Sequence, residues 1–303
     1  MTDNVWLIGN KGMLGTELAL LLGKSGVSFS GTDREVDITD PAAIENFINS
    51  QARLFTWIIN CAAYTAVDKA EDDMENCRLL NTAGAAYIAS AARKTGAKLI
   101  HISTDYVFNG RGYCAFSGKR PYSEDDETDP AGVYGLTKRD GEVRVLEENA
   151  QSYIIRTAWL YGRYGNNFVH SMLRLMKERD NVSVVDDQWG SPTWTFDLAE
   201  AIGTLLRLHR TCSPIPYGIY HYTGEGETTW YNFAREIYTQ SRALGILTEN
   251  CDIKPCSSVE FPARVKRPAY SVLDKTKIKK ALGLKIPGWE TSLKIFLPTM
   301  VQT

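Results

Sequence analysis

The chain lacks the features that mark a membrane-spanning, metal-binding or nucleic-acid-binding protein. Its 303 residues contain no apolar run near the roughly 20 residues that span a bilayer. The four histidines lie far apart without an HExxH pair, and a net charge of −2 offers no basic surface for nucleic acid or an anionic membrane. No positive region precedes the first apolar run, so we expect no signal peptide and a cytoplasmic location.

Cysteine is present but shows no pairing pattern. Because no two of the six cysteines form a CxxC pair, we expect reduced, mostly buried thiols and no disulfide or zinc site. They are Cys61, Cys77, Cys114, Cys212, Cys251 and Cys256. Apolar residues make up 44% of the chain and charged residues 23%, which is typical of a globular protein with one large domain or two smaller ones.

The first half of the sequence alternates short apolar runs with helical patterns. Asp40-Pro41 is typical of a helix start, with Asp40 as the N-cap. The pattern predicts strands over 5–8, 27–29, 57–60, 98–103 and 153–157, and helices over 13–24, from 41 onward, 71–94 and 134–148. This alternation predicts an α/β fold with a Rossmann-type, doubly wound parallel sheet.

The second half of the sequence is less regular. It predicts helices near 167–178, 195–208 and 229–243, followed by an irregular, proline-containing stretch over 252–270. We therefore expect an NAD(P)-binding Rossmann domain over 1–160, completed by part of 180–222, and a smaller, mainly substrate-binding C-terminal portion over 161–303. Open α/β sheets bind ligands at the carboxyl ends of their strands, so this portion should pack there.

A glycine-rich turn joins the first predicted strand to the first helix. Its glycines, in the spacing GxxGxxG, let the backbone approach a pyrophosphate while the helix N-terminus supplies free N–H groups. The turn residues assigned to cofactor binding are Gly9, Gly12, Met13, Leu14 and Gly15. A plain tight turn is the alternative interpretation.

Asp33-Arg34 follows the second predicted strand, where dinucleotide-binding folds hold the adenosine ribose. An acid here bonds the ribose hydroxyl of NAD, whereas an arginine holds the 2′-phosphate of NADP. Because a guanidinium is the more specific phosphate ligand, the pair favours NADPH over NADH, and an exposed charged loop is the alternative. Asp37 and Ile38, slightly further on, are placed to flank the adenine.

Two polar clusters supply the chemistry. Thr104 and Asp105 follow the fourth strand, facing the expected crevice, where they can contact a substrate carbonyl and sugar hydroxyls. Tyr134 and Lys138 share a helix face at i and i+4. A lysine cation beside a phenol lowers its pKa from about 10 toward working pH, which suits Tyr134 to be the general acid for a carbonyl that receives hydride. A surface pair is the alternative interpretation for this YxxxK.

The order of these clusters resembles the short-chain dehydrogenase/reductase superfamily. Three segments, 60–71, 103–108 and 187–193, resemble the dTDP-4-dehydrorhamnose reductase family in particular, and 156–162 and 165–168 fit it as well. The resemblance extends over nearly the whole chain, to about Leu273. It implies reduction of the C-4 keto group of dTDP-4-dehydro-L-rhamnose by NADPH, the last step in making dTDP-L-rhamnose.

The resemblance also implies roles for individual residues. Thr104, Tyr134 and Lys138 form the catalytic set, and Trp159 packs on the sugar ring, with a core aromatic as the equal alternative. Asn167 and Arg267 are candidates for the substrate phosphates. The further cofactor-binding residues are Ala62, Ala63, Tyr64 and Thr65.

A metal is not predicted. Some family members place a magnesium ion at a dimer contact between acidic side chains. Glu17 suits that role, but residues 192–196 contain no glutamate, so we predict no magnesium and expect a monomer or a homodimer.

Two alternatives compete with the reductase. One is a nucleotide-sugar epimerase or dehydratase, which needs a tightly held NAD. The other is a non-catalytic NADP-binding subunit like the beta subunit of methionine adenosyltransferase. The intact set of Thr104, Tyr134, Lys138 and Trp159 favours catalysis, although a fold can keep a site that it no longer uses.

Overall fold

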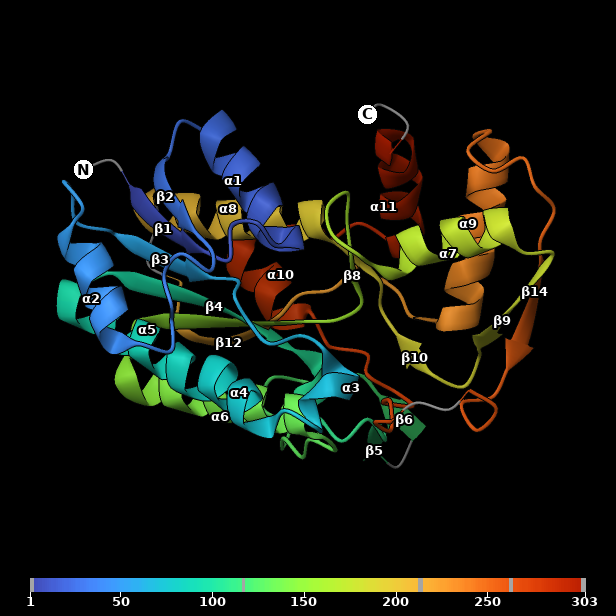
Figure 1. Cartoon of the computed structure of the whole chain (residues 1–303), viewed down its shortest axis with the longest axis horizontal. Coiled ribbons are helices and arrows are strands. Elements are labelled where there is room, and N and C mark those ends of the chain that lie inside the picture. Colours follow the sequence, from blue (N-terminus) through green and yellow to red (C-terminus); the bar gives the residue numbers. More distant parts are fainter. Residues whose placement is uncertain (1–2, 116–117, 212–214, 262–263, 301–303) are drawn as a thin grey trace.

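A six-stranded parallel sheet forms the centre of the computed structural model, which describes residues 3–115, 118–211, 215–261 and 264–300 (Figure 1). The strand order is β12-β7-β4-β3-β1-β2, and every neighbouring pair is parallel. The strands are β1 (Asn4–Ile8), β2 (Ser28–Thr32), β3 (Trp57–Asn60), β4 (Lys98–Thr104), β7 (Ser152–Thr157) and β12 (Gly218–His221). The predicted doubly wound sheet is therefore confirmed. Its order reverses at β1, where the chain turns from β2 on one side to β3 on the other.

Helices cover both faces of this sheet (Figure 1). One face carries α1 (Met13–Lys24), α8 (Thr195–Thr211) and α10 (Thr276–Leu282), and the other carries α2 (Pro41–Asn49), α5 (Ala85–Thr95) and α6 (Val133–Glu148). Leu14, Leu18 and Leu22 of α1 recur every four residues, so one stripe of the helix is buried against the strands. The α2 N-cap is Asp40, whose carboxylate accepts from the backbone N–H of Ala42, as predicted.

The helix predicted over 71–94 is confirmed from Met74 onward, but it begins three residues later and is not a regular α-helix throughout. The chain forms α3 (Val67–Ala70), α4 (Met74–Arg78), a π-helical segment (Leu79–Gly84) and then α5. The π-helical segment surrounds Asn81, whose amide bonds both the N–H and the carbonyl of Tyr64, at 2.8 and 3.2 Å. A Cβ on Gly141 would overlap the Asn81 carbonyl, so α6 lies directly against the widened turn. Tertiary contacts thus interrupt a sequence that is continuously helical in pattern.

The second half builds a smaller apolar cluster around α7 (Phe168–Glu178), α9 (Trp230–Ala243) and α11 (Trp289–Phe296). Beside it, β14 (Asp252–Cys256) pairs in parallel with β9 (Asn181–Val185). The irregular stretch predicted from 252 is therefore wrong at its start. Pro255 within the segment argued against a strand, but β14 pairs only along one side, where proline is tolerated.

Short elements complete the described chain. They are β5 (Tyr113–Ala115), β6 (Gly118–Arg120), β8 (Leu160–Tyr161), β10 (Trp189–Gly190), β11 (Thr193–Trp194), β13 (Thr228–Thr229) and single 3₁₀ turns at Asp105–Val107 and Leu297–Met300. Within the described ranges, no helix is long and apolar enough to cross a bilayer. Of the cysteines, Cys61, Cys77, Cys251 and Cys256 are free thiols, while Cys212 and the side chain of Cys114 lie outside the described residues.

Candidate active site

A cleft of about 960 Å³ opens at the carboxyl ends of β1, β3, β4 and β7. Every residue that the sequence assigned to cofactor binding lines it, together with the three catalytic candidates. They are Gly9, Gly12, Met13, Leu14, Gly15, Asp33, Arg34, Asp37, Ile38, Ala62, Ala63, Tyr64, Thr65, Thr104, Tyr134 and Lys138. The fold thus brings residues from the whole first half of the chain to one surface.

The glycine turn is shaped as a phosphate cradle. Gly9 has φ of 74°, and a Cβ there would lie 2.8 Å from the Ala62 nitrogen. A Cβ on Gly15 would overlap the Gly9 carbonyl, so Gly15 lets α1 pack against the turn. Gly12 is different: it is exposed, and an added Cβ would meet only the Gly9 oxygen, at 3.3 Å. Gly12 is also the N-cap of α1 and offers no side-chain cap, so the first N–H groups of the helix are open to a ligand.

The rim after β2 carries the residues expected at the adenosine ribose. Arg34 is exposed, and none of the ion pairs among the described residues engages its guanidinium. Its neighbour Glu35 pairs with Lys11 at 3.3 Å instead. Asp37 accepts from the N–H and hydroxyl of Thr39, and these hydrogen bonds hold the pKa of its carboxyl below the usual value. Of the two cations at this rim, Lys11 is thus paired, and the Arg34 guanidinium is available to bind an anionic group of a ligand.

Tyr134, Lys138 and Thr104 all line the cleft, and the side chains of Tyr134 and Thr104 hydrogen-bond with each other. Burial raises the pKa of the Tyr134 phenol, and hydrogen bonding from the Thr104 side chain acts against this rise. The expected lowering of the Tyr134 pKa by Lys138 is wrong, because burial dominates. The Lys138 Nζ donates to the Ile102 carbonyl at 2.7 Å and lies 3.3 Å from His101 Nε2. Burial lowers the pKa of Lys138 to about 8.

Buried polar atoms without partners belong to residues of the same cleft. They are the hydroxyls of Ser103 and Thr157 and one carboxylate oxygen of Asp105, and all three residues line the cleft. The other Asp105 oxygen accepts from the Thr104 hydroxyl at 3.0 Å. Burial raises the pKa of Asp105 to about 6. Unsatisfied buried groups are costly, so this cluster fits a polar ligand.

Trp159 forms part of the cleft wall just after β7. Its backbone has φ of 48°, and among the described residues it is the only non-glycine with a positive φ. Its ring stacks on Trp230 of α9, and a Cβ on Gly190 would overlap its indole. The second half of the chain thus fixes one aromatic ring at the cleft.

The two phosphate candidates lie outside the cleft lining. Asn167 caps α7: its oxygen accepts from the His170 N–H at 3.2 Å, and its amide donates to the Gly162 carbonyl at 2.8 Å. Arg267 pairs with Asp68 and donates to the Tyr106 hydroxyl at 3.1 Å. Tyr106 lines the cleft, so Arg267 stands directly behind its wall.

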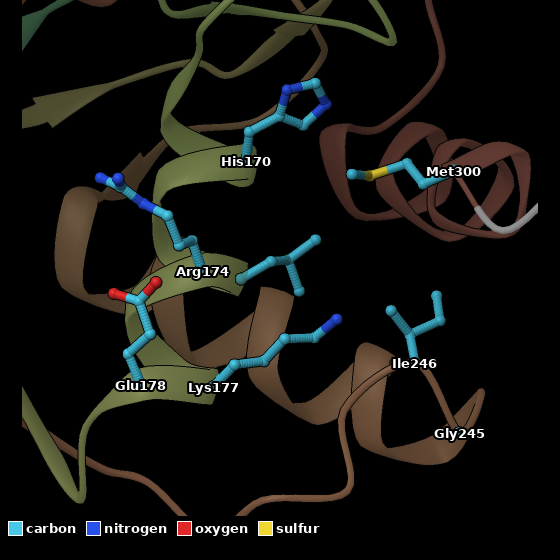
Figure 2. Close-up of a pocket in the computed structure, with 8 residues that line it drawn as sticks. His170, Arg174, Lys177, Glu178, Gly245, Ile246 and Met300 are labelled. Atoms are coloured by element: carbon cyan, nitrogen blue, oxygen red, sulfur yellow. The ribbon is translucent and has the colours of Figure 1, made fainter. Parts of the chain in front are cut away.

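A second cavity, of about 550 Å³, lies at α7 and shares no residue with the cleft. Figure 2 shows Lys177 reaching toward Ile246 and Met300, while Arg174 and Glu178 extend from the opposite side of the helix. It does not include the glycine turn over residues 9–15, and it is smaller than the cleft. Among the described residues, no group of three His, Cys, Asp or Glu side chains lies close enough to bind a metal. We therefore place the candidate active site in the larger cleft.

Sequence reasoning missed His101 and Trp230. His101 is a polar side chain between the apolar residues Ile100 and Ile102 of β4, which was a usable signal. Trp230 gave no such signal, because its role depends on a contact with Trp159, 71 positions earlier in the chain.

Comparison with known proteins agrees with this geometry. Residues 3–302 match the family described as the RmlD substrate binding domain. The chain is 42% identical to dTDP-4-dehydrorhamnose reductase of Streptomyces griseus, covering 97% of this chain and 93% of that protein. It is 38% identical to dTDP-4-keto-6-deoxy-D-glucose reductase of Streptomyces niveus, covering 99% and 98%.

A solved structure extends the comparison to three dimensions. The dTDP-4-dehydrorhamnose reductase of Bacillus anthracis, in complex with NADP, is 36% identical and superposes with a TM-score of 0.88, covering 99% of this chain and 100% of that one. Its likeness to this chain runs over both the sheet and the C-terminal portion. The chain belongs to the RmlD family, that of the dTDP-4-dehydrorhamnose reductases.

Proposed function

We propose that this chain reduces the C-4 keto group of dTDP-4-dehydro-L-rhamnose with NADPH and yields dTDP-L-rhamnose. The observation that carries the proposal is the convergence of Thr104, Tyr134 and Lys138 with the glycine turn in one cleft. The names of the relatives, and the NADP of the Bacillus anthracis structure, support it.

The cleft residues fit a reduced dinucleotide. The uncapped N-terminus of α1 and the exposed Gly12 suit the pyrophosphate, and Arg34 suits a 2′-phosphate. Asp33, Asp37 and Ile38 would flank the adenosine, while Ala62 to Thr65 would border the rest of the cofactor. When bound, NADPH supplies the hydride.

The chain supplies the proton and the orientation. Tyr134 keeps its proton, because burial raises its pKa, and would deliver it to the ketone oxygen as that oxygen becomes an alkoxide. Thr104 would hydrogen-bond the same oxygen, and Asp105 the sugar hydroxyls. Trp159 would stack on the sugar ring. Arg267 would reach the phosphates after exchanging its contact with Asp68.

The test is loss of the reduced-nicotinamide absorbance with freshly prepared dTDP-4-dehydro-L-rhamnose, with the product identified by mass and NMR. NADH in place of NADPH and dTDP-4-keto-6-deoxy-D-glucose in place of the L-sugar are the parallel assays, since a 38% identical relative is named for the second ketone. Turnover of that ketone alone would assign the chain to the other reaction. Tight NADPH binding without turnover of either ketone would contradict the proposal and favour a non-catalytic subunit.

A further inference from the structure

A chain of buried hydrogen-bonding groups runs beneath Lys138. The backbone N–H of Ala62 donates to Asn60 Oδ1 at 3.0 Å, and Asn60 Nδ2 lies 3.1 Å from His101 Nδ1. His101 Nε2 lies 3.3 Å from Lys138 Nζ, which also donates to the Ile102 carbonyl at 2.7 Å. Asn60, His101 and Lys138 are each 1% exposed, so these contacts lie in the protein interior.

The geometry fixes which nitrogen of His101 carries the hydrogen. A backbone N–H only donates, so the Asn60 atom that faces Ala62 is the oxygen, and the amide NH₂ faces His101 Nδ1. Nδ1 must therefore accept. Burial, reinforced by the charge of Lys138, lowers the pKa of His101 well below its usual value, so the ring is neutral. A neutral imidazole that accepts at Nδ1 holds its hydrogen on Nε2.

That hydrogen points at Lys138. An ammonium has three N–H groups and no lone pair, so it meets the His101 Nε2–H as one donor facing another. A neutral amine has a lone pair that accepts from Nε2–H while one of its own hydrogens goes to Ile102. We propose that His101 is a positioning residue that donates to the Lys138 amine and sets when Lys138 carries a proton. This inference rests on the proposed function for its catalytic meaning.

The other titratable groups near Lys138 do not favour its neutral amine as the His101 N–H does. Glu142, one turn along α6, favours the ammonium, but Arg156 of β7 binds its carboxylate with bonds of 3.0 and 2.7 Å. Burial raises the pKa of the Cys61 and Cys77 thiols, so both stay neutral. Burial lowers the pKa of Lys138 to about 8 even though Glu142 favours the ammonium, so the neutral amine that His101 can donate to is within reach of working pH.

A lysine that exchanges its proton readily can restore Tyr134. After the phenol has given its proton to the alkoxide oxygen, the phenolate must regain a proton, and Lys138 can serve as its source only while it is an ammonium. Once it has given that proton, the lysine is the neutral amine, which accepts from His101 Nε2–H until water returns a proton to Nζ. The i, i+4 spacing of Tyr134 and Lys138 on α6 places both groups on one helix face.

The first test needs neither a mutation nor a substrate. Long-range ¹H–¹⁵N NMR of the full chain reports the protonated nitrogen of His101, and labelled lysine, assigned with Lys138→Arg, reports the titration of Nζ. We expect Nε2–H and a depressed Lys138 pKa. An Nδ1–H tautomer, or a Lys138 pKa at the ordinary lysine value, overturns the proposal.

Two matched variants separate the hydrogen bond from the bulk of the ring. His101→Gln keeps an N–H near the Nε2 position, whereas His101→Asn keeps a polar group only near Nδ1. We expect His101→Asn to raise the Lys138 pKa, and the alkaline limb of kcat, by about one unit, while His101→Gln leaves both near the wild-type position. Equal shifts in the two variants mean that the ring is only structural and overturn the proposal. The NMR titration uses no sugar, so it tests the role of His101 independently of the reductase assay. Either proposal can therefore be contradicted while the other stands.

Discussion

Trp159 and Trp230 stack face to face, with ring centroids 3.5 Å apart and ring planes 8° from parallel. Trp159 adopts this position with a left-handed backbone that costs a side-chain-bearing residue about 1–3 kcal/mol. Gly190 leaves room for the other edge of the indole. Because α9 belongs to the C-terminal cluster, the stack fixes the position of a cleft residue relative to that cluster.

Trp230→Ala should therefore weaken use of the nucleotide sugar. Without its stacking partner Trp159 gains freedom, and we expect kcat/KM for the sugar to fall about 3- to 10-fold, the value of one aromatic pair. The dissociation constant of NADPH, measured by fluorescence, should be unchanged. Trp230→Phe is the control, because it keeps a ring against Trp159, and an equal loss in both variants would contradict a stacking role.

Tyr134→Phe should abolish most turnover and leave the cofactor bound. The change removes the proton donor but only one oxygen from the cleft, so kcat should fall about 10²- to 10⁴-fold. Binding of NADPH, titrated by fluorescence, should stay within a few-fold of wild type. If NADPH binding is lost instead, Tyr134 holds the cleft together and another group donates the proton.

Two glycines of one turn should respond differently to a side chain. Gly12 has φ of −74°, and an added Cβ would meet only the Gly9 oxygen, at 3.3 Å, so Gly12→Val should fold with a small loss of stability and weaken NADPH binding by crowding the pyrophosphate. Gly15 packs on the Gly9 carbonyl, so Gly15→Ala should lower the free energy of unfolding by about 1–3 kcal/mol. Urea unfolding and NADPH titration of both variants test the contrast, and a Gly12→Val variant as destabilised as Gly15→Ala would show that the turn tolerates no side chain at all.

Local patterns predicted four of the six strands of the main sheet closely, but β2 lies over Ser28–Thr32 instead of 27–29, and β12 was not predicted as a strand. Apolar runs ending in glycine or polar residues predicted β1, β3, β4 and β7 to within about two residues, because a strand buried on both faces must be apolar throughout. The π-helical segment and β14 were not predicted, since both depend on distant partners. Asn81 meets Tyr64 only in the folded chain, and β14 becomes a strand only beside β9.

In the candidate site too, features set by local spacing were predictable and features set by distant contacts were not. The turn at Gly12 and the pair Tyr134 and Lys138 have spacings that any reader of the sequence can find. The direction in which the Lys138 side chain points has no such signal in the sequence, because it depends on a contact with His101, 37 positions earlier in the chain. Spacing alone predicted that the lysine lowers the Tyr134 pKa, whereas burial dominates in the folded protein and raises it.

Arg34→Ala should change which cofactor is preferred. An exposed guanidinium that meets a 2′-phosphate contributes about 1.5–3 kcal/mol, so affinity for NADPH should fall about 10- to 100-fold while that for NADH stays the same. The reciprocal variant, Asp33→Ala, should weaken NADH more than NADPH if its carboxylate bonds the ribose hydroxyls. Equal losses of both cofactors in Arg34→Ala would show that the arginine is not at the phosphate.

Asp105→Asn should stabilise the protein in a pH-dependent way. Burial raises the Asp105 pKa from 3.8 to about 6, so the folded state holds this proton more tightly than the unfolded state does. Stability is therefore lost as pH rises from the unfolded to the folded pKa, and the full cost above pH 6 is about 3 kcal/mol. Asparagine carries no charge, so its variant should match wild type near about pH 4 and exceed it increasingly up to about pH 7 in urea unfolding.

The same variant tests why the chain keeps a costly acid in its cleft. If the Asp105 carboxylate holds sugar hydroxyls, Asp105→Asn should raise KM for the nucleotide sugar while the protein becomes more stable, since an amide offers a single acceptor oxygen. Asp105→Glu is the control, because its longer side chain keeps a carboxylate in the buried site but moves it away from the Asp105 position. A variant that is more stable and equally active would remove Asp105 from the substrate contacts and leave Ser103 and Thr157 as the unpartnered groups that await a ligand.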